Sequence, residues 1–230
     1  MPKKLIILYG APGAGKGTQA RLLYQKYHFY NFDTGTYLED ILYDPDNGKS
    51  KIIQREKKLF EAGILCTPSW ILKILKAKVK QISDGGINLI LSGSPRTMLE
   101  AFGDDKTSGL MDALVKGYGR KNIVIVQLEM PEEASLGRNA TRLLCSFCDG
   151  AVLGKYYANL KLCPFCGEKL YRRKVDRSEI MHTRIKNYVV RTKPIISELK
   201  KRGFKVIKID ASPMPAIVAK SIAKKVFGKD

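Results

Sequence analysis

Gly10-Ala-Pro-Gly-Ala-Gly-Lys-Gly-Thr18 carries the strongest structural signal in the sequence. It follows an apolar segment at 5–9 and precedes residues of helical character, so the local order is strand, glycine-rich turn and helix. Glycines let backbone N–H groups turn inward without clashes from Cβ atoms, and such amides together with a helix N-terminus attract phosphate. The stretch is therefore predicted to bind a polyphosphate, with Lys16 reaching the β- and γ-phosphates as a positive charge.

Apolar segments and helical segments alternate along the rest of the chain. Five apolar segments are expected to be strands: 4–9, 28–32, 87–91, 122–128 and 205–209. This alternation predicts an α/β fold with a five-stranded parallel sheet and helices on both faces. Ligands of such sheets bind at the carboxyl ends of the strands, where the segments 10–18, 92–96 and 129–133 are expected to lie.

Two of the expected helices bear on the candidate site. One is predicted over 131–144, which places Arg138 and Arg142 four residues apart on one helix face. The other is predicted over 176–202, with Pro194 as a position where it kinks or breaks. The polar segment 103–121 carries no clear helix or strand pattern.

Composition narrows the class of protein. The chain has 230 residues with 44% hydrophobic residues, and it has no run of eighteen apolar residues, so no membrane-spanning helix is expected. The N-terminus leads straight into the first expected strand, which favours a structural segment over a cleaved signal. A cytoplasmic location is therefore expected. The net charge of +19 is compatible with a solvated basic surface, with phosphate ligands or with nucleic-acid binding.

Four of the five cysteines form two closely spaced pairs. They follow the pattern Cys-x2-Cys-x14-Cys-x2-Cys and are Cys145, Cys148, Cys163 and Cys166. In a reducing compartment such pairs favour metal over disulfides. Four thiolates fill a tetrahedral shell and leave no place for water, so a structural Zn²⁺ is predicted. The fifth, Cys66, is expected to be an apolar packing residue.

The phosphate-binding stretch departs from the general P-loop pattern, because Gly17 follows Lys16 and the hydroxyl comes one residue later, at Thr18. This form resembles the nucleoside monophosphate kinases, above all the adenylate kinases. Ser-Gly-Ser-Pro-Arg at 92–96 is similar to their Asp-Gly-Phe-Pro-Arg, and the cysteine segment resembles the zinc-binding lid of their long form. The similarity covers essentially the whole chain.

The resemblance implies an organisation and a reaction. It implies phosphoryl transfer from ATP with Mg²⁺ to AMP, giving two ADP, in a protein expected to be a monomer. It implies a core of 1–32, 67–140 and 178–230, a monophosphate-binding insert at 33–66 and a zinc-binding lid at 141–177, both mobile.

The resemblance also implies residue roles. The catalytic set is Lys16, Arg96, Arg138, Arg142, Arg173 and Arg184. The donor nucleotide is bound by Gly13, Ala14, Gly15, Lys16, Gly17, Thr18, Arg138 and Arg142. The acceptor is bound by Thr34, Gly35, Cys66, Gly93, Arg96, Glu100, Arg173 and Arg184.

Several positions depart from the family pattern. Glu39 stands where the family has an arginine on the monophosphate, and its carboxylate is expected to repel the ligand or to point away. Ser92 replaces an aspartate that holds magnesium through water, and Glu129 is one candidate to take over that role. Val175 replaces the first of two acidic residues at the lid hinge, and Asp176 retains the second.

Glu100 replaces a glutamine that recognises adenine in the family. A carboxylate only accepts hydrogen bonds, so GMP or another monophosphate stays an alternative acceptor to AMP. A weakly catalytic nucleotide-binding regulator and an RNA-binding protein are the two further alternatives.

Overall fold

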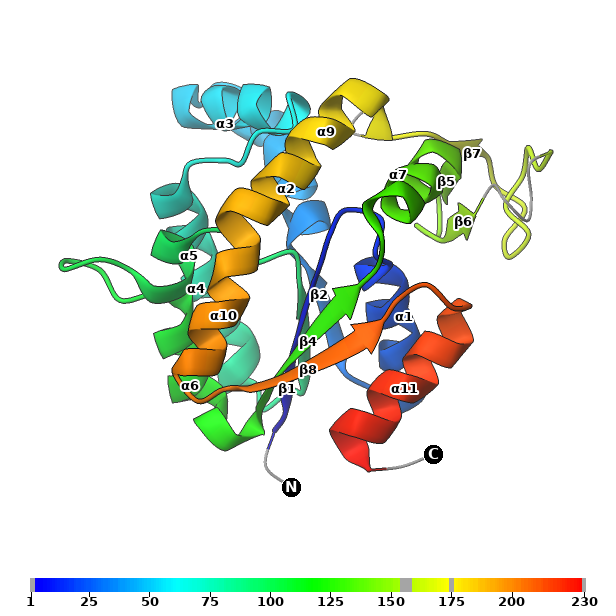
Figure 1. Ribbon diagram of the computed structural model, residues 1–230. Helices are drawn as coiled ribbons and strands as arrows, with labels where there is room; N and C mark the ends of the chain where they lie inside the picture. Colours follow the sequence, from blue (N-terminus) through cyan, green and yellow to red (C-terminus); the bar gives the residue numbers. More distant parts are fainter. Residues whose placement is uncertain (1–2, 154–158, 174–175, 229–230) are drawn as a thin grey trace.

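A parallel β-sheet forms the centre of the computed structural model, which describes residues 3–153, 159–173 and 176–228 (Figure 1). The described residues place five strands in this sheet in the order β2-β3-β1-β4-β8. The strands are β1 (Leu5–Gly10), β2 (Tyr30–Asp33), β3 (Leu89–Ser92), β4 (Ile123–Glu129) and β8 (Lys205–Asp210). All neighbours pair in parallel, so the predicted fold class is confirmed.

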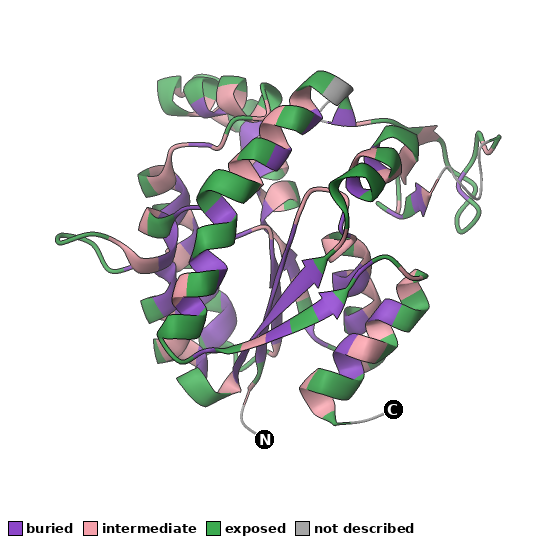
Figure 2. Cartoon of the chain, in the orientation of Figure 1, coloured by how far each residue is buried: buried purple, intermediate pink, exposed green. Residues whose placement is uncertain are grey.

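Helices cover both faces of the sheet, because the side chains of the three central strands β1, β3 and β4 are buried on both sides. Ile6 and Leu8 pack into one core cluster, whereas Leu5 and Ile7 pack into the other, and all four are buried. Figure 2 shows that buried positions concentrate on the central strands and on the helix sides that face them. The helices on the first face are α1 (Lys16–Tyr27) and α11 (Pro215–Phe227). Those on the second are α4 (Pro68–Asp84), α5 (Met98–Phe102), α6 (Leu110–Tyr118) and α10 (Lys193–Lys201).

The strand order creates a crevice at the carboxyl end of the sheet. The chain winds from β1 toward β2 and β3 on one side and returns to β4 and β8 on the other. Ligands of doubly wound sheets bind where the order reverses in this way. The register aligns Asp33 with Ser92 and Gly10 with Leu128, so the loops that follow these strands start at the same level.

The segment between β2 and α4 forms a helical insert beyond the end of the sheet. It contains α2 (Thr34–Tyr43), a 3-10 turn (Pro45–Asn47) and α3 (Lys51–Glu61). Asp33 accepts a hydrogen bond from the backbone amide of Thr36 and so caps α2. In Figure 1 this insert lies at the top of the molecule beside α9 (Ser178–Asn187).

The cysteine segment forms a second, smaller sheet. Its antiparallel strands, in the order β6-β5-β7, are β5 (Arg142–Cys145), β6 (Ala151–Leu153) and β7 (Leu170–Tyr171). The preceding helix α7 (Glu132–Thr141) is shorter than the predicted 131–144, because β5 pairs with β6 from Arg142 onward. The prediction that Arg138 and Arg142 share a helix face is therefore wrong.

The predicted disturbance of the long C-terminal helix is confirmed. A five-residue π-helical turn (Tyr188–Thr192) separates α9 from α10, and Pro194 lies in the first turn of α10. Proline has no N–H to donate and its ring would clash with the carbonyl four residues earlier, so a wider turn precedes it. The unassigned segment 103–121 contains α6, and a 3-10 turn (Arg120–Asn122) follows it. Val175 lies outside the described residues.

Candidate active site

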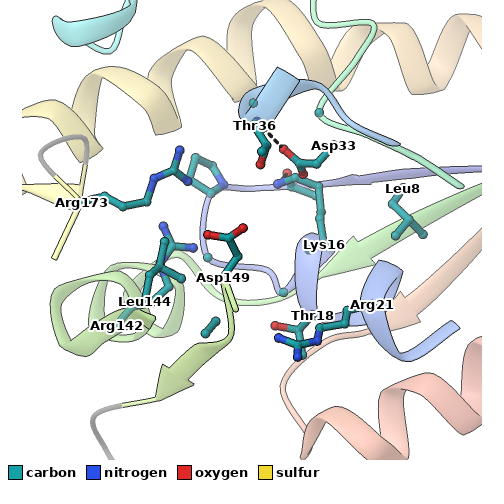
Figure 3. Close-up of a pocket in the computed structure, with 18 of the residues that line it drawn as sticks. Leu8, Lys16, Thr18, Arg21, Asp33, Thr36, Arg142, Leu144, Asp149 and Arg173 are labelled. Carbon is teal, nitrogen blue, oxygen red and sulfur yellow. Dashed lines mark hydrogen bonds between the residues drawn. The ribbon is translucent and has the colours of Figure 1, made fainter. Parts of the chain in front are cut away.

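A cavity of about 910 Å³ lies over the carboxyl end of the sheet, between the P-loop, the insert and the small sheet. Figure 3 shows Lys16, Arg142 and Arg173 pointing into it from three different parts of the chain. The predicted site residues that line it are Gly13, Gly15, Lys16, Gly17, Thr18, Gly35, Gly93, Arg96, Arg138, Arg142, Arg173 and Arg184. Four other predicted residues are buried and are not among the described residues of its lining: Ala14, Thr34, Cys66 and Glu100.

The P-loop has the backbone that its glycines allow. Gly13 and Gly15 have φ values of 87° and 85°, in the left-handed region that favours glycine. A Cβ on Gly13 would lie 2.2 Å from the Asn139 Nδ2 atom and 2.7 Å from the Ser135 carbonyl oxygen, so no side chain fits there. Gly15 precedes α1 and has no side chain to cap it, which leaves the first amides of α1 available to an anion.

Lys16 is folded back on its own loop. Its Nζ donates to the carbonyl oxygens of Gly10, at 2.7 Å, and Ala11, at 3.0 Å. Withdrawal from water, and then the charges of Arg96 and Arg184, lower the pKa of Lys16 to about 7. The charge of Asp33 acts in the opposite direction and offsets these effects only in part.

Arg96 is held by the loop that follows β3. Its Nε donates to the Gly93 carbonyl, and its own carbonyl accepts a hydrogen bond from Thr192 Oγ1 at 3.0 Å. Its backbone amide donates to Glu100 Oε2 at 2.7 Å. These bonds fix the backbone of Arg96 and the root of its guanidinium at the cavity wall.

Glu100 lies behind Arg96 as a support for this loop. It is 2% exposed, and its second oxygen accepts a hydrogen bond from Thr97 Oγ1 at 3.1 Å. Burial raises the pKa of the Glu100 carboxyl above its usual range. Both of its oxygens are thus engaged by the protein.

Arg142 and Arg184 converge on one buried carboxylate. Arg142 donates from Nη2 to Asp176 Oδ1 at 2.6 Å and from Nε to Oδ2 at 3.1 Å, and Arg184 Nη1 lies 3.3 Å from Oδ1. The Asp176 side chain is 3% exposed. Burial, followed by the charges of Arg96 and Arg173, lowers the pKa of Arg184 to about 10.

The two remaining arginines are held differently. Arg173, which follows β7, forms an ion pair with Glu39 of α2, so the carboxylate neither points away nor stands alone. Arg138 donates to the carbonyls of Ala211, at 2.9 Å, and Ser212, at 2.8 Å, after β8. Arg138 and Arg142 thus line one cavity although they lie on different elements.

The carboxylate of Asp33 lies next to the side chain of Ser92. The Ser92 hydroxyl donates to Asp33 Oδ2 at 2.6 Å, and Asp33 lines the cavity beside Lys16 (Figure 3). Sequence reasoning did not name Asp33 as a site residue, because its pairing with Ser92 follows from the strand register. Glu129 does not serve this corner: its carboxylate bonds to Lys208 and Gln127, and it is not among the described lining residues.

The four paired cysteines meet in one cluster that could hold a metal ion. Their sulfur atoms all lie within 4.8 Å of one another, with 3.4 Å between Cys145 and Cys166 and 3.7 Å between Cys148 and Cys163. Backbone amides of Cys148 and Phe147 donate to the Cys145 sulfur and lower the pKa of that thiol to about 7. In a tetrahedral site with bonds of ~2.3 Å, sulfurs lie about 3.8 Å apart, so the cluster fits zinc.

Cys66 lies apart from this cluster, and its thiol is buried. The side chain is 5% exposed, and its sulfur donates to the Glu56 carbonyl at 3.6 Å. Burial raises the pKa of the Cys66 thiol to about 12, which keeps it protonated and unreactive. This agrees with its expected role as an apolar packing residue.

Comparisons with known proteins agree with this geometry. The family model described as adenylate kinase matches residues 8–204. The chain is 30% identical to an adenylate kinase of Caldicellulosiruptor bescii over 204 residues, which are 88% of this chain and 89% of that protein. It is 31% identical to an adenylate kinase of Archaeoglobus fulgidus over 86% of this chain and 87% of that protein, and 29% identical to one of Borrelia garinii over 98% and 99%. With the P-loop, the parallel sheet and the arginine-lined cavity in place, the chain belongs to the adenylate kinase family.

Proposed function

We propose that the chain transfers the γ-phosphoryl group of ATP to AMP and so gives two ADP. Its family is one of phosphotransferases, and its similarity to adenylate kinases supports a nucleoside monophosphate kinase. The observation that carries the proposal is the convergence of the P-loop lysine and the five predicted arginines, from the core, the small sheet and α9, on one cavity. Such transfer needs positioning and charge neutralisation more than covalent catalysis by the protein.

The donor side of the cavity is the P-loop. The amides at the start of α1 and the ammonium of Lys16 bind the β- and γ-phosphates, and the Thr18 hydroxyl lies in the same lining. Lys16 then exchanges its two carbonyl partners for phosphate oxygens. Arg138 and Arg142 approach the donor from the side of α7 and β5.

The acceptor side is formed by the loop after β3 and by the insert. Arg96 binds the phosphate of AMP through its planar guanidinium, with Arg173 and Arg184 beside it. The Thr34 hydroxyl is buried without a hydrogen-bond partner among the described residues, which supports a ligand contact there. Glu100 and Cys66 then shape the base side from behind the lining.

Magnesium fits the donor set of this cavity, because Thr18 and Asp33 offer the oxygen ligands that this ion prefers, directly or through water. When bound with ATP, the ion neutralises charge on the β- and γ-phosphates. Asp33 orients this corner through its hydrogen bond from Ser92. Asp33 thus supplies the carboxylate for magnesium that position 92, a serine in this chain, does not.

The small sheet acts as a lid over the donor nucleotide. A structural Zn²⁺ held by the four cysteines would keep residues 141–177 rigid, so that the lid closes as one body and excludes water from the phosphoryl group. The hydrogen bond from Arg21 of α1 to the Cys148 carbonyl, at 3.3 Å, supports a closed position of the lid against the core.

A panel of nucleotides tests the proposal. Purified protein with MgATP is expected to convert AMP to ADP faster than it converts GMP, CMP or UMP to their diphosphates. Faster turnover of GMP would show that guanine, and not adenine, is the preferred base of the acceptor. Absence of turnover with tight ATP binding would refute the kinase proposal in favour of a regulator.

None of the described helices is long and apolar enough to span a membrane. The paired thiols favour a reducing compartment, and we propose the cytoplasm and a monomer. RNA binding by the basic surface would appear as salt-sensitive affinity that survives removal of the Lys16 ammonium.

A further inference from the structure

We propose that Glu39 acts as an internal competitor of the acceptor phosphate: its carboxylate occupies Arg173 and ties the insert to the lid until AMP displaces it. The inference rests on the proposed function, because the ligand it competes with is the monophosphate. It concerns the affinity for the acceptor and the closure of the cavity before any ligand binds.

The ion pair joins two segments that the fold otherwise keeps apart. Glu39 lies on α2 in the insert and Arg173 lies two residues after the end of β7 in the small sheet, 134 positions later in the chain. Both side chains belong to the wall of the cavity, where the Glu39 side chain is 33% exposed and that of Arg173 is 21% exposed. A contact of this kind holds the two segments together across the cavity that the substrates must enter.

The charges of the cavity explain why the pair forms. Among the described residues of the lining, the cations are Lys16, Arg21, Arg96, Arg138, Arg142, Arg173 and Arg184, and the carboxylates are Asp33, Glu39 and Asp149. Such a concentration of positive charge is unfavourable in the absence of an anion. The nearby carboxylate of Glu39 raises the pKa of Arg173, against the lowering effect of burial.

Two other carboxylates near the cavity have different partners. Asp176 is shared by Arg142 and Arg184, and Asp33 accepts hydrogen bonds from Ser92 and the Thr36 amide. Among the described residues, Glu39 is the carboxylate that pairs directly with Arg173, and the charges of Asp176 and Asp33 act on it from farther away. A carboxylate and a phosphate present similar oxygen acceptors to a guanidinium, so they compete for the Nη2 donor of Arg173 that Glu39 occupies.

Displacement has two consequences. The phosphate of AMP binds Arg173 only after the Glu39 pair separates, and the freed carboxylate then lies beside the anion and repels it. Glu39 thus weakens AMP binding, and in the unliganded protein it favours the closed arrangement of insert and lid. ATP, which binds at the P-loop on the other side of the cavity, does not need this pair to break.

The test compares Glu39→Gln with Asp40→Asn. The first substitution removes the carboxylate with little change in shape, and the second removes the same charge from the adjacent, exposed position of α2. Titration calorimetry with AMP alone is expected to show about fivefold tighter binding to E39Q than to wild type, an effect typical of one partly exposed ion pair. D40N is expected to bind AMP as wild type does, and ATP affinity, as a check on the fold, to be the same in all three.

A second readout follows the shape of the protein. Small-angle X-ray scattering of the unliganded proteins is expected to give a larger radius of gyration for E39Q than for wild type and D40N. Equal or weaker AMP binding by E39Q, with normal turnover by wild type, overturns the inference and leaves the proposed function intact. Failure of wild type to bind AMP at all overturns both.

Discussion

The P-loop places the ammonium group of Lys16 where its positive charge is unfavourable in the unliganded protein. The ammonium sits among arginines and away from bulk water, which lowers its pKa to about 7 in the unliganded protein. A bound polyphosphate offsets both effects, because it adds negative charge next to the nitrogen. The surroundings that disfavour the positive charge of Lys16 in the unliganded protein therefore also favour the binding of an anion next to it.

This gives a prediction about protons. At pH 8 the free Lys16 is mostly neutral, so binding of ATP is expected to take up ~0.9 proton per protein as the pKa rises again. For the same reason ATP affinity falls as pH increases above 7. Calorimetry of ATP binding in two buffers of different ionisation enthalpy measures the uptake, and uptake below about 0.2 proton would contradict the assignment. Lys26→Met, at an exposed position of α1, should keep the uptake that Lys16→Met removes.

Asp33 and Ser92 give a second prediction at this scale. They are register partners on neighbouring strands, so an exchange of their side chains keeps one carboxylate and one hydroxyl at the same corner. Asp33→Asn is expected to weaken Mn²⁺ binding to the ADP complex by about tenfold or more, as loss of a group that orients a metal's ligands does. The double variant D33S/S92D is expected to restore it, since serine still caps α2.

Electron paramagnetic resonance of Mn²⁺ titrated into the nucleotide complex measures this affinity without turnover. Wild-type affinity in D33N, or a double variant no better than D33N, would refute a magnesium role for Asp33. Ser92→Ala serves as the matched control, because it removes the hydroxyl and leaves the carboxylate.

At the scale of elements, the small antiparallel sheet depends on its sulfur cluster more than on a core of its own. The aromatic side chains of its two cysteine turns, Phe147 and Phe165, are 79% and 76% exposed, so they add little apolar burial. Without a metal ion, the small sheet would be held mainly by the few hydrogen bonds between its strands. The core sheet has its own buried clusters and needs none of this.

Removal of the metal is therefore expected to unfold the lid alone. After treatment with a strong chelator, trypsin should cleave within 141–177 at least about tenfold faster, while the core keeps its helical circular dichroism. Cys163→Ser should behave in the same way without chelator, and Cys66→Ser, which alters a buried packing residue, should not expose the lid. Unchanged lid cleavage in the metal-free protein would show that the cluster has no structural role.

At the scale of the whole molecule, the P-loop, the Arg96 loop, the insert and the small sheet contribute to a single cavity. A ligand that joins two adenosines through a chain of phosphates should therefore bind both halves of the site at once. Stabilisation by such a ligand depends on its affinity for the folded state.

We expect this two-headed ligand to raise the melting temperature of wild type by several degrees, as ~3 kcal/mol of binding energy does for a domain of this size. Lys16→Met and Arg96→Ala should each lose most of the shift and all measurable turnover, with unchanged melting temperature in the free state. A full shift in either variant would refute the placement of both nucleotides in this cavity.

The sequence by itself determined the P-loop, the five parallel strands, the position where Pro194 interrupts the long helix and the grouping of four cysteines. Each of these follows from local chemistry: apolar runs, glycines that permit positive φ, a missing N–H and a ligand spacing. It also named the arginines of the site through family similarity, although their convergence is not written in any local pattern.

The contacts between side chains on different elements follow from the tertiary structure alone. Arg142 is on a strand rather than on the helix of Arg138, Asp33 faces Ser92, Glu39 binds Arg173, and Glu129 bonds to Lys208. These pairings join positions that are far apart in the chain, and they depend on strand register and on how the insert and lid pack. Spacing along the sequence constrains neighbours within one helix or strand, whereas contacts between elements are set by the folded arrangement as a whole.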